Sequence, residues 1–211
     1  MQPANAPKRR RGRPPKDAAG FNATREDLIR AGLEVLTEKG FSAVGIDEIL
    51  HRVQVPKGSF YHYFPSKDAF GLQLIERYAD YFAHKLDRYL TDATLSHLQR
   101  LRAFMDDATR GMSRYAFKRG CLVGNLGQEM GVLPEHFRAR ITAVFADWQA
   151  RVGQCLKAAQ MAGEISPALD CQRLAIVFWI GWEGAVLRAK LERSAEPLEA
   201  FGEFFIAGIT R

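Results

Sequence analysis

Residues 55–67 read "VPKGSFYHYFPSK", and this stretch decides the fold. A short helical pattern at about 46–52 and a break in that pattern precede it. Pro56, a residue type tolerated at the first helical position, opens a second short helix that we expect to reach about Tyr63. Two short helices joined by a tight turn, behind a supporting helix, form the helix-turn-helix plan. Residues 23–66 are therefore predicted to form a DNA-binding domain.

The polar ends of this stretch suit DNA, whereas its phenylalanines suit a core. We expect Phe60 and Phe64, four residues apart, to pack inside the module. A glycine near a helix N-terminus lets a phosphate approach the backbone, and the free N–H groups there favour an anion. The residues that we assign to DNA contact here are Lys57, Gly58, Ser59, Tyr61, His62, Tyr63 and Lys67. The alternative is that the aromatic side chains, Tyr63 included, form only the core of the module.

The supporting helix is predicted to begin at Thr24, which together with Asp27 resembles a capping box. We also assign Thr24 to DNA contact. Gly40 is predicted to stop this helix. Gly45 then serves as the N-cap of the next helix, although it is a weaker cap than serine.

The rest of the chain has a helical pattern almost throughout. Three apolar stripes repeat at steps of three and four residues: Phe70, Leu74, Tyr78 and Tyr81; Leu98, Leu101, Met105, Ala108, Met112 and Tyr115; and Phe137, Ile141, Val144, Trp148, Val152 and Cys155. Further helices are expected at about 170–192 and from Pro197 onward. Because no segment alternates with a period of two, we predict an all-α chain with about nine helices.

The net charge of +6 lies in an N-terminal tail. Residues 1–16 contain six Lys and Arg and no acidic residue. Residues 1–22 show no helical or strand period and are expected to be disordered. Within them Arg11 and Arg13 belong to a segment that resembles an AT-hook, so we assign both to the minor groove of DNA. The alternative is a solvated charge run that adds affinity without selectivity.

Other features narrow the class of protein. Three cysteines without CxxC spacing fit a reducing compartment, so we expect a cytoplasmic protein. The five histidines lack metal-ligand spacing, and the glycines of "GCLVGNLG" at 120–127 match no nucleotide-binding motif. We therefore predict no enzyme, no metal site and no cofactor. The longest apolar run, at 174–187, is too short to cross a bilayer, which predicts no membrane partner.

The segment "GLEVLTEKGFSAVGIDEILHRVQVPKGSFYHYFPSKDAF", residues 32–70, closely resembles the DNA-binding region of TetR-family transcriptional repressors. It has the family's order of helix, Gly-Phe, short helix, Lys-Gly-x-x-Tyr-x-Tyr-Phe and Ser-Lys. The resemblance implies a repressor that binds a pseudo-palindromic DNA operator as a homodimer and is released by a small-molecule inducer. Val44 and Gly45 depart from the family, which often has threonine or serine there, so no phosphate contact from a hydroxyl group is expected at these positions.

The same resemblance implies that residues 67–211 form a helical ligand-binding and dimerisation domain. In the family the last two helices pair with their copies in the second subunit. Here the last helix offers three phenylalanines that we expect to be exposed for that purpose, Phe201, Phe204 and Phe205.

Two later segments, "RGCLVGNLGQEMGVLPEHFR" at 119–138 and "FWIGWEGAVLRAKLE" at 178–192, are similar to acrylate-responsive repressors of the family. They are similar, less closely, to electrophile-sensing members, in which a cysteine and a late lysine are tied to sensing. The matching positions here are Cys121 and Lys190. The resemblance implies acrylate or a related unsaturated compound as inducer. The alternative is a repressor that senses reactive electrophiles covalently through Cys121.

Helical spacing also points to a sensing site. Two sets of residues each share one helix face: Asn125, Gln128 and Glu129; and Trp179, Glu183, Val186 and Lys190. A carboxylate within an apolar helix needs a partner or a raised pKa, and Lys190 is a candidate partner for Glu183. The alternative for Glu183 is a structural ion pair. Trp148, Trp179 and Trp182 are either core residues or part of a pocket wall.

Cys121 permits two interpretations. Free cysteines are usually buried and inert. Against that, the nearby Lys118 and Arg119, and a helix starting near Cys121, are expected to lower the pKa of its thiol. Cys155 and Cys171 lack such surroundings and are expected to be structural.

Overall fold

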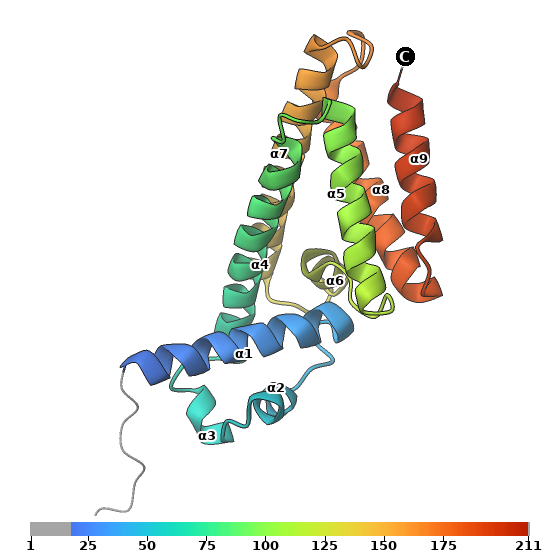
Figure 1. Ribbon diagram of the computed structural model, residues 1–211. Helices are drawn as coiled ribbons and strands as arrows, with labels where there is room; N and C mark the ends of the chain where they lie inside the picture. Colours follow the sequence, from blue (N-terminus) through green and yellow to red (C-terminus); the bar gives the residue numbers. More distant parts are fainter. Residues whose placement is uncertain (1–17, 211) are drawn as a thin grey trace, which may run out of the picture.

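The computed structural model describes residues 18–210, which fold into nine α-helices (Figure 1). These are α1 (Ala18–Lys39), α2 (Ile46–Val53), α3 (Lys57–Phe60), α4 (Lys67–Leu90), α5 (His97–Arg114), α6 (Leu122–Gln128), α7 (Glu135–Met161), α8 (Cys171–Glu192) and α9 (Glu196–Ile209). No strand occurs within this range, where the β pairing consists of a single antiparallel bridge between Ile165 and Thr210. The prediction of an all-α fold with about nine helices is confirmed.

Helices α1, α2 and α3 form a small module at one end of the molecule, with α1 lying across the foot of the larger bundle (Figure 1). Gly45 is the N-cap of α2, as predicted, and caps it without a side-chain hydrogen bond. The core of the module is aromatic. The ring of Phe64 lies 5.4 Å from that of Phe60 and 4.6 Å from that of Phe70 at the start of α4. All three rings are buried, which confirms the core role of Phe60 and Phe64.

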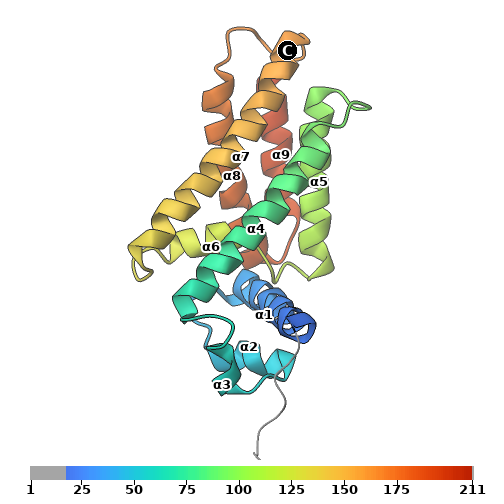
Figure 2. The same ribbon diagram turned by 90° about the vertical axis from the view of Figure 1, so that its left-hand side faces the viewer.

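Helices α4, α5, α7, α8 and α9 run along the length of the bundle, and the short α6 crosses it close to α1 (Figure 2). Pro134 caps the start of α7, whose predicted stripe from Phe137 to Cys155 is buried throughout. A Cβ atom on Gly181 of α8 would lie 2.1 Å from the ring of Phe201 on α9. This glycine therefore allows α8 and α9 to pack closely. None of the described helices is both long enough and apolar enough to span a membrane.

The supporting helix starts earlier than predicted. It begins at Ala18, and Thr24 lies inside it, where the hydroxyl group donates a hydrogen bond to the Gly20 carbonyl at 3.0 Å. The capping box predicted at Thr24 is therefore wrong. A tertiary contact accompanies the additional turns, because the ring of Phe21 lies 4.6 Å from that of Tyr63. Such a contact leaves no periodic signal in the sequence.

One helical boundary and two apolar stripes also differ from the prediction. The regular part of α3 ends at Phe60 rather than near Tyr63, although the N–H of Tyr63 still donates to the Phe60 carbonyl. Tyr81 was predicted to belong to the buried stripe of α4 but is exposed, because the stripe turns through Phe82 instead. Tyr115, at the end of α5, is likewise exposed.

The three phenylalanines of α9 are not all exposed. Phe204 is 80% exposed, as predicted. Phe205 is buried, with its ring 5.2 Å from that of Phe178 on α8, and Phe201 is half-buried against the same ring. The expectation that Phe205 faces outward is wrong, since neighbouring residues of a helix point about 100° apart.

Candidate DNA interface and ligand cavity

The start of α3 and the turn that follows it form an exposed polar surface. Tyr61 is 57% exposed, and Gly58 and His62 are exposed beside it. A Cβ atom on Gly58 would meet no atom within 4 Å, so the backbone here is open to a phosphate group. Nζ of Lys57 lies 2.7 Å from a carboxylate oxygen of Asp47 on α2, and this hydrogen bond raises the pKa of Lys57.

Three of the assigned DNA contacts lie partly or wholly off this surface. Ser59 is half-buried, and Tyr63 is half-buried against Phe21. Thr24 is only 8% exposed within α1. Their DNA contacts stay predictions. The arginines of the tail, Arg11 and Arg13, lie outside the described residues.

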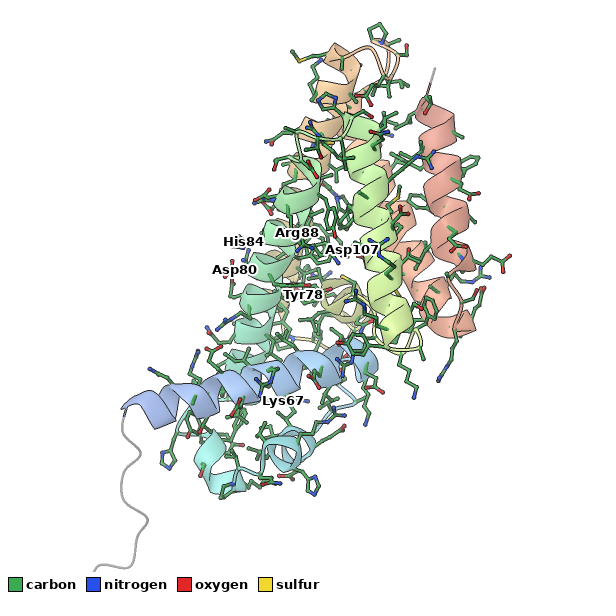
Figure 3. All side chains as sticks on the ribbon, in the orientation of Figure 1. Lys67, Tyr78, Asp80, His84, Arg88 and Asp107 are labelled. Carbon is green, nitrogen blue, oxygen red and sulfur yellow. The ribbon has the colours of Figure 1, made fainter. Side chains whose placement is uncertain are left out.

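Lys67 has a structural role that the sequence did not predict. Its Nζ donates a hydrogen bond to the Phe41 carbonyl at 2.9 Å and lies 4.4 Å from the centre of the Phe41 ring. Burial lowers the pKa of Lys67. The side chain thus ties the start of α4 to the turn between α1 and α2 (Figure 3). The DNA contact assigned to Lys67 stays a prediction.

A cavity of about 550 Å³ lies between the small module and the bundle. Its walls come from α1, α4, α5, α8 and the chain leading into α6. Cys121, Trp182 and Glu183 of the predicted sensor set line it. Apolar wall residues that sequence reasoning missed include Ile29, Leu33, Phe82 and Met112, whereas Val186 was placed on the sensing face of its helix. They resemble ordinary core residues in sequence, and only the packing of distant helices brings them to one cavity.

Cys121 is the N-cap of α6, where its sulfur accepts a hydrogen bond from the Gly124 N–H at 3.4 Å. Burial, and then the negative charge of Glu183, raise the pKa of the thiol well above its ordinary value. The predicted lowering of this pKa is wrong. Arg119 does not reach the thiol, because its guanidinium lies 3.3 Å from Glu34 and stacks over the Tyr115 ring at 4.1 Å.

Glu183 projects from α8 onto α6. A Cβ atom on Gly124 would lie 2.0 Å from Oε2 of Glu183, so the carboxyl group rests directly against the backbone of α6. Burial raises the pKa of Glu183 to about 7. Lys190 is not its partner, since Nζ of Lys190 faces the Thr37 carbonyl of α1 at 3.4 Å. Of the two outcomes expected for Glu183, a partner or a raised pKa, the structure supports the raised pKa, and the candidate pairing with Lys190 is wrong.

The predicted polar face of α6 joins the two parts of the molecule instead of lining the cavity. Glu129 accepts hydrogen bonds from the N–H groups of Phe41 at 2.9 Å and Ser42 at 2.7 Å. The Asn125 amide donates to the carbonyl of Thr37, at the end of α1, at 3.0 Å. With Gln128, these residues line a second hollow of about 390 Å³.

The tryptophans divide between core and cavity. Trp148 and Trp179 are buried, with rings 4.9 Å apart, and line neither hollow. Their indole N–H groups have no hydrogen-bond partner among the described residues. Trp182 is also buried and contributes to the wall of the larger cavity. The core interpretation therefore describes Trp148 and Trp179, and the pocket interpretation describes Trp182.

Comparison with known proteins places this arrangement in a family. The family model described as "Bacterial regulatory proteins, tetR family" matches residues 28–74, and "Tetracyclin repressor-like, C-terminal domain" matches residues 97–205. The chain belongs to the TetR family. It is a transcriptional regulator with a helix-turn-helix DNA-binding module, and the TetR-family resemblance of residues 32–70 is confirmed.

Two relatives extend the likeness over most of the chain. Transcriptional regulator AcuR of Cereibacter sphaeroides is 55% identical over 203 residues, covering 96% of this chain and 92% of AcuR. HTH-type transcriptional repressor NemR of Escherichia coli is 32% identical over 176 residues, covering 83% and 88%. A crystal structure of regulatory protein TetR from Rhodobacter sphaeroides superposes with a TM-score of 0.87 at 55% identity, covering 89% of this chain and 99% of that one. These relatives are regulators, which agrees with the prediction that the TetR-family chain is not an enzyme.

Proposed function

We propose that this protein represses transcription as a homodimer on a pseudo-palindromic operator in the bacterial cytoplasm, and that acrylate or a related small unsaturated compound releases it. The observation that carries the proposal is the shared wall of the cavity. Leu33 of α1, in the DNA-binding module, and Glu183 of α8 line the same space. A ligand bound there touches both halves of the molecule. It therefore favours one relative position of the two halves over another.

The contacts around the end of α1 provide the coupling. The Leu36 and Thr37 carbonyls accept hydrogen bonds from Asn125 of α6, and Thr37 also accepts one from Gly120. Gly120 directly precedes Cys121 in the cavity wall. A ligand that displaces Cys121 or α6 therefore moves the end of α1. Helix α1 packs against α2, and α2 packs against α3, the helix that we assign to the major groove. A movement of α1 therefore changes the spacing of the two α3 helices in the dimer.

On the DNA side, we assign the major-groove contacts to the exposed surface around α3. Lys57, Gly58, Tyr61 and His62 offer charge, open backbone and polar tips in one place. Ser59, Tyr63, Thr24 and Lys67 are proposed as neighbouring phosphate contacts. The proposed role of the tail arginines in the minor groove predicts a salt dependence of operator binding that flattens when residues 1–16 are deleted.

Homodimerisation is proposed through the outer face of α8 and α9. Apolar or small residues follow one stripe of α8 at steps of three and four, and all are exposed: Val177, Ile180, Gly184, Leu187 and Leu191. Phe204 of α9 is exposed as well. A contiguous apolar face of this kind is typical of an interface between subunits. Helix α9 packs against α8, which fits an interface made of two helices from each subunit.

The dimer is tested by placing a charge in this stripe. Ile180→Asp is expected to convert the dimer to a monomer, because a carboxylate cannot be buried there without a partner. Sedimentation velocity measures the mass. Met161→Asp is the control, since Met161 is 82% exposed at the end of α7. A dimer that survives Ile180→Asp would place the interface elsewhere.

The inducer is tested by titrating operator DNA with and without acrylate, using wild type and Cys121→Ser. We expect acrylate to release both proteins, because burial keeps the Cys121 thiol protonated and unreactive. Propionate, which lacks the double bond, is the matched control ligand. Release that is lost in Cys121→Ser, with operator affinity kept, would favour the electrophile-sensing alternative. Failure of acrylate to release either protein would remove acrylate as the inducer.

A further inference from the structure

Three polar groups from three different elements meet at one part of the cavity. Glu183 comes from α8, Tyr78 from α4 and Cys121 from the start of α6. A Cβ atom on Gly124 would lie 2.0 Å from Oε2 of Glu183 and 3.6 Å from the Cβ atom of Cys121, so the carboxyl group and Cys121 meet at the same point of the α6 backbone. Tyr78 lines the same cavity. Figure 3 shows Tyr78 on the stretch of α4 beside α6. Apolar members of the cavity wall include Phe82, Trp182 and Val186.

Among residues 18–210, no cation forms an ion pair with Glu183. The charged residues that line the cavity are Glu26, Arg30, Glu34, Arg77, Lys85 and Arg119. None of the ion pairs found among the described residues includes Glu183.

Each cation of the cavity pairs with another carboxylate. Arg77 lies 2.6 Å from Glu26, and Arg119 lies 3.3 Å from Glu34. Lys85 and Arg30 each lie 2.7 Å from aspartates outside the cavity wall, Asp107 and Asp27. Tyr81 and Tyr115 add two phenol groups, and no histidine lines the cavity among the described residues.

The absence of a counter-charge fixes the protonation of the cluster. Burial raises the pKa of Glu183 to about 7, and burial also raises the pKa of both Tyr78 and Cys121. Below pH 7 the cluster therefore carries a carboxylic acid, a phenol and a thiol. All three are hydrogen-bond donors. A set of donors in an apolar wall suits a ligand group rich in acceptors, such as a carboxylate.

We propose that protonated Glu183, with Tyr78 and Cys121, binds the carboxylate of the inducer, so that inducer binding is coupled to the uptake of a proton. The ionised form of Glu183 would instead place two negative charges together at a site where no described cation pairs with either, which is unfavourable. The acid group of Glu183 keeps its proton and donates it in a hydrogen bond to a ligand oxygen. A molecule whose Glu183 is ionised takes one proton from solvent when the ligand binds. This inference rests on the proposed function and adds the chemistry by which the cavity selects a small organic acid.

The test is calorimetry of acrylate binding to the full-length protein between about pH 6 and about pH 8.5. Acrylate stays ionised throughout, because carboxylic acids titrate near about pH 4. We expect a constant Kd at the acid end and a rise that approaches about tenfold per pH unit above about pH 7. Repeating the titration at pH 7.5 in two buffers with different ionisation enthalpies measures the proton uptake directly. We expect a value between zero and one proton per ligand, and that measurement needs no variant.

Glu183→Gln provides the matched variant, since the amide remains neutral and keeps a donor. It is expected to bind acrylate with no dependence on pH in this range. Glu135→Gln is the control, because Glu135 is an exposed carboxylate at the start of α7 whose loss should leave the wild-type profile unchanged.

The outcomes separate this inference from the proposed function. Acrylate binding that is independent of pH in wild type, or a Glu183→Gln variant that keeps the wild-type profile, would overturn the inference alone. A complete lack of acrylate binding at about pH 6, with operator binding intact, would overturn both it and the acrylate assignment.

Discussion

The exposed turn after α3 and the polar cluster in the cavity each contain a tyrosine, in opposite environments. Tyr61 is exposed to solvent on the DNA-binding module, whereas burial raises the pKa of Tyr78 in the cavity. A second contrast lies outside the cavity: Lys57 has its pKa raised by a hydrogen bond to Asp47, whereas burial lowers the pKa of Lys190, which lines the second hollow. This comparison shows that exposure to solvent and nearby hydrogen-bond partners, more than residue type, decide the pKa of each group. One region suits a polyanion and the other a small organic acid.

The largest expected effect concerns two neighbours on opposite sides of the module. Phe60→Ala should lower the free energy of unfolding by about 3–5 kcal/mol, because it leaves a cavity in a fully buried aromatic core. Tyr61→Ala should change it by less than about 0.5 kcal/mol, because Tyr61 is exposed. Urea denaturation followed by circular dichroism compares them. Equal losses would show that the inward and outward sides of the module are wrongly assigned.

The protonation of Glu183 in the cavity is tested by comparing how the stabilities of wild type and Glu183→Gln depend on pH. Since folding raises the pKa of Glu183 to about 7, its contribution is fully present at low pH and is lost between about pH 4.5 and about pH 7. The wild type should therefore lose stability relative to Glu183→Gln by up to about 3 kcal/mol over that interval. Thermal denaturation without ligand at several pH values measures the difference. Parallel curves for the two proteins would contradict the burial of an ionisable carboxyl group.

On the exposed turn, Tyr61→Ala is expected to weaken operator binding by about 10- to 100-fold, the usual range for loss of a good DNA contact. Its stability should be unchanged, so the loss can be assigned to the interface. Fluorescence anisotropy with labelled operator measures the affinity, and Met161→Ala, altered at an exposed site on α7, is the control. An unchanged affinity would remove Tyr61 from the DNA surface.

The smallest expected effect comes from a second glutamate whose surroundings reverse those of Glu183. Glu164 accepts hydrogen bonds from the backbone N–H groups of His97 and Leu98 at the start of α5. Burial opposes its ionised form, but these bonds and that of the His97 ring outweigh burial and lower its pKa to about 2.

Glu164→Gln should therefore destabilise the protein by about 1 kcal/mol at neutral pH. The stability that ionised Glu164 provides is present above about pH 4.5 and is lost as the pH falls toward about pH 2. The two proteins should thus converge at acid pH in thermal denaturation. A gap that persists at about pH 2 would mean that the carboxylate charge is not what stabilises the helix start.

Structural features that depend on a few neighbouring residues could be predicted from the sequence. The helix-turn-helix plan could be derived from Pro56, Gly58 and the paired aromatics, because turn chemistry and helix starts depend on neighbouring residues. The buried stripe of α7 followed from spacing alone. The raised pKa of Glu183 was one of two outcomes that the sequence allowed, because Glu183 is the only charged residue between Arg173 and Arg188.

Contacts between distant segments were not predictable. The sequence suggested positively charged surroundings for Cys121, because Arg119 is its near neighbour in the chain. In the folded protein the guanidinium of Arg119 pairs with Glu34 instead, and the negative charge of Glu183 acts on the thiol. Lys190 shares a helix face with Glu183, yet it reaches the end of α1.

The sequence by itself thus determined the helices, the module that binds DNA and the presence of a buried carboxyl group. Only the tertiary structure decided which groups surround that carboxyl group and which helices enclose the cavity. The physical reason is the distance along the chain over which each effect acts. Helix propensity, capping and periodicity act within a few residues, whereas desolvation and charge depend on neighbours in space that packing selects.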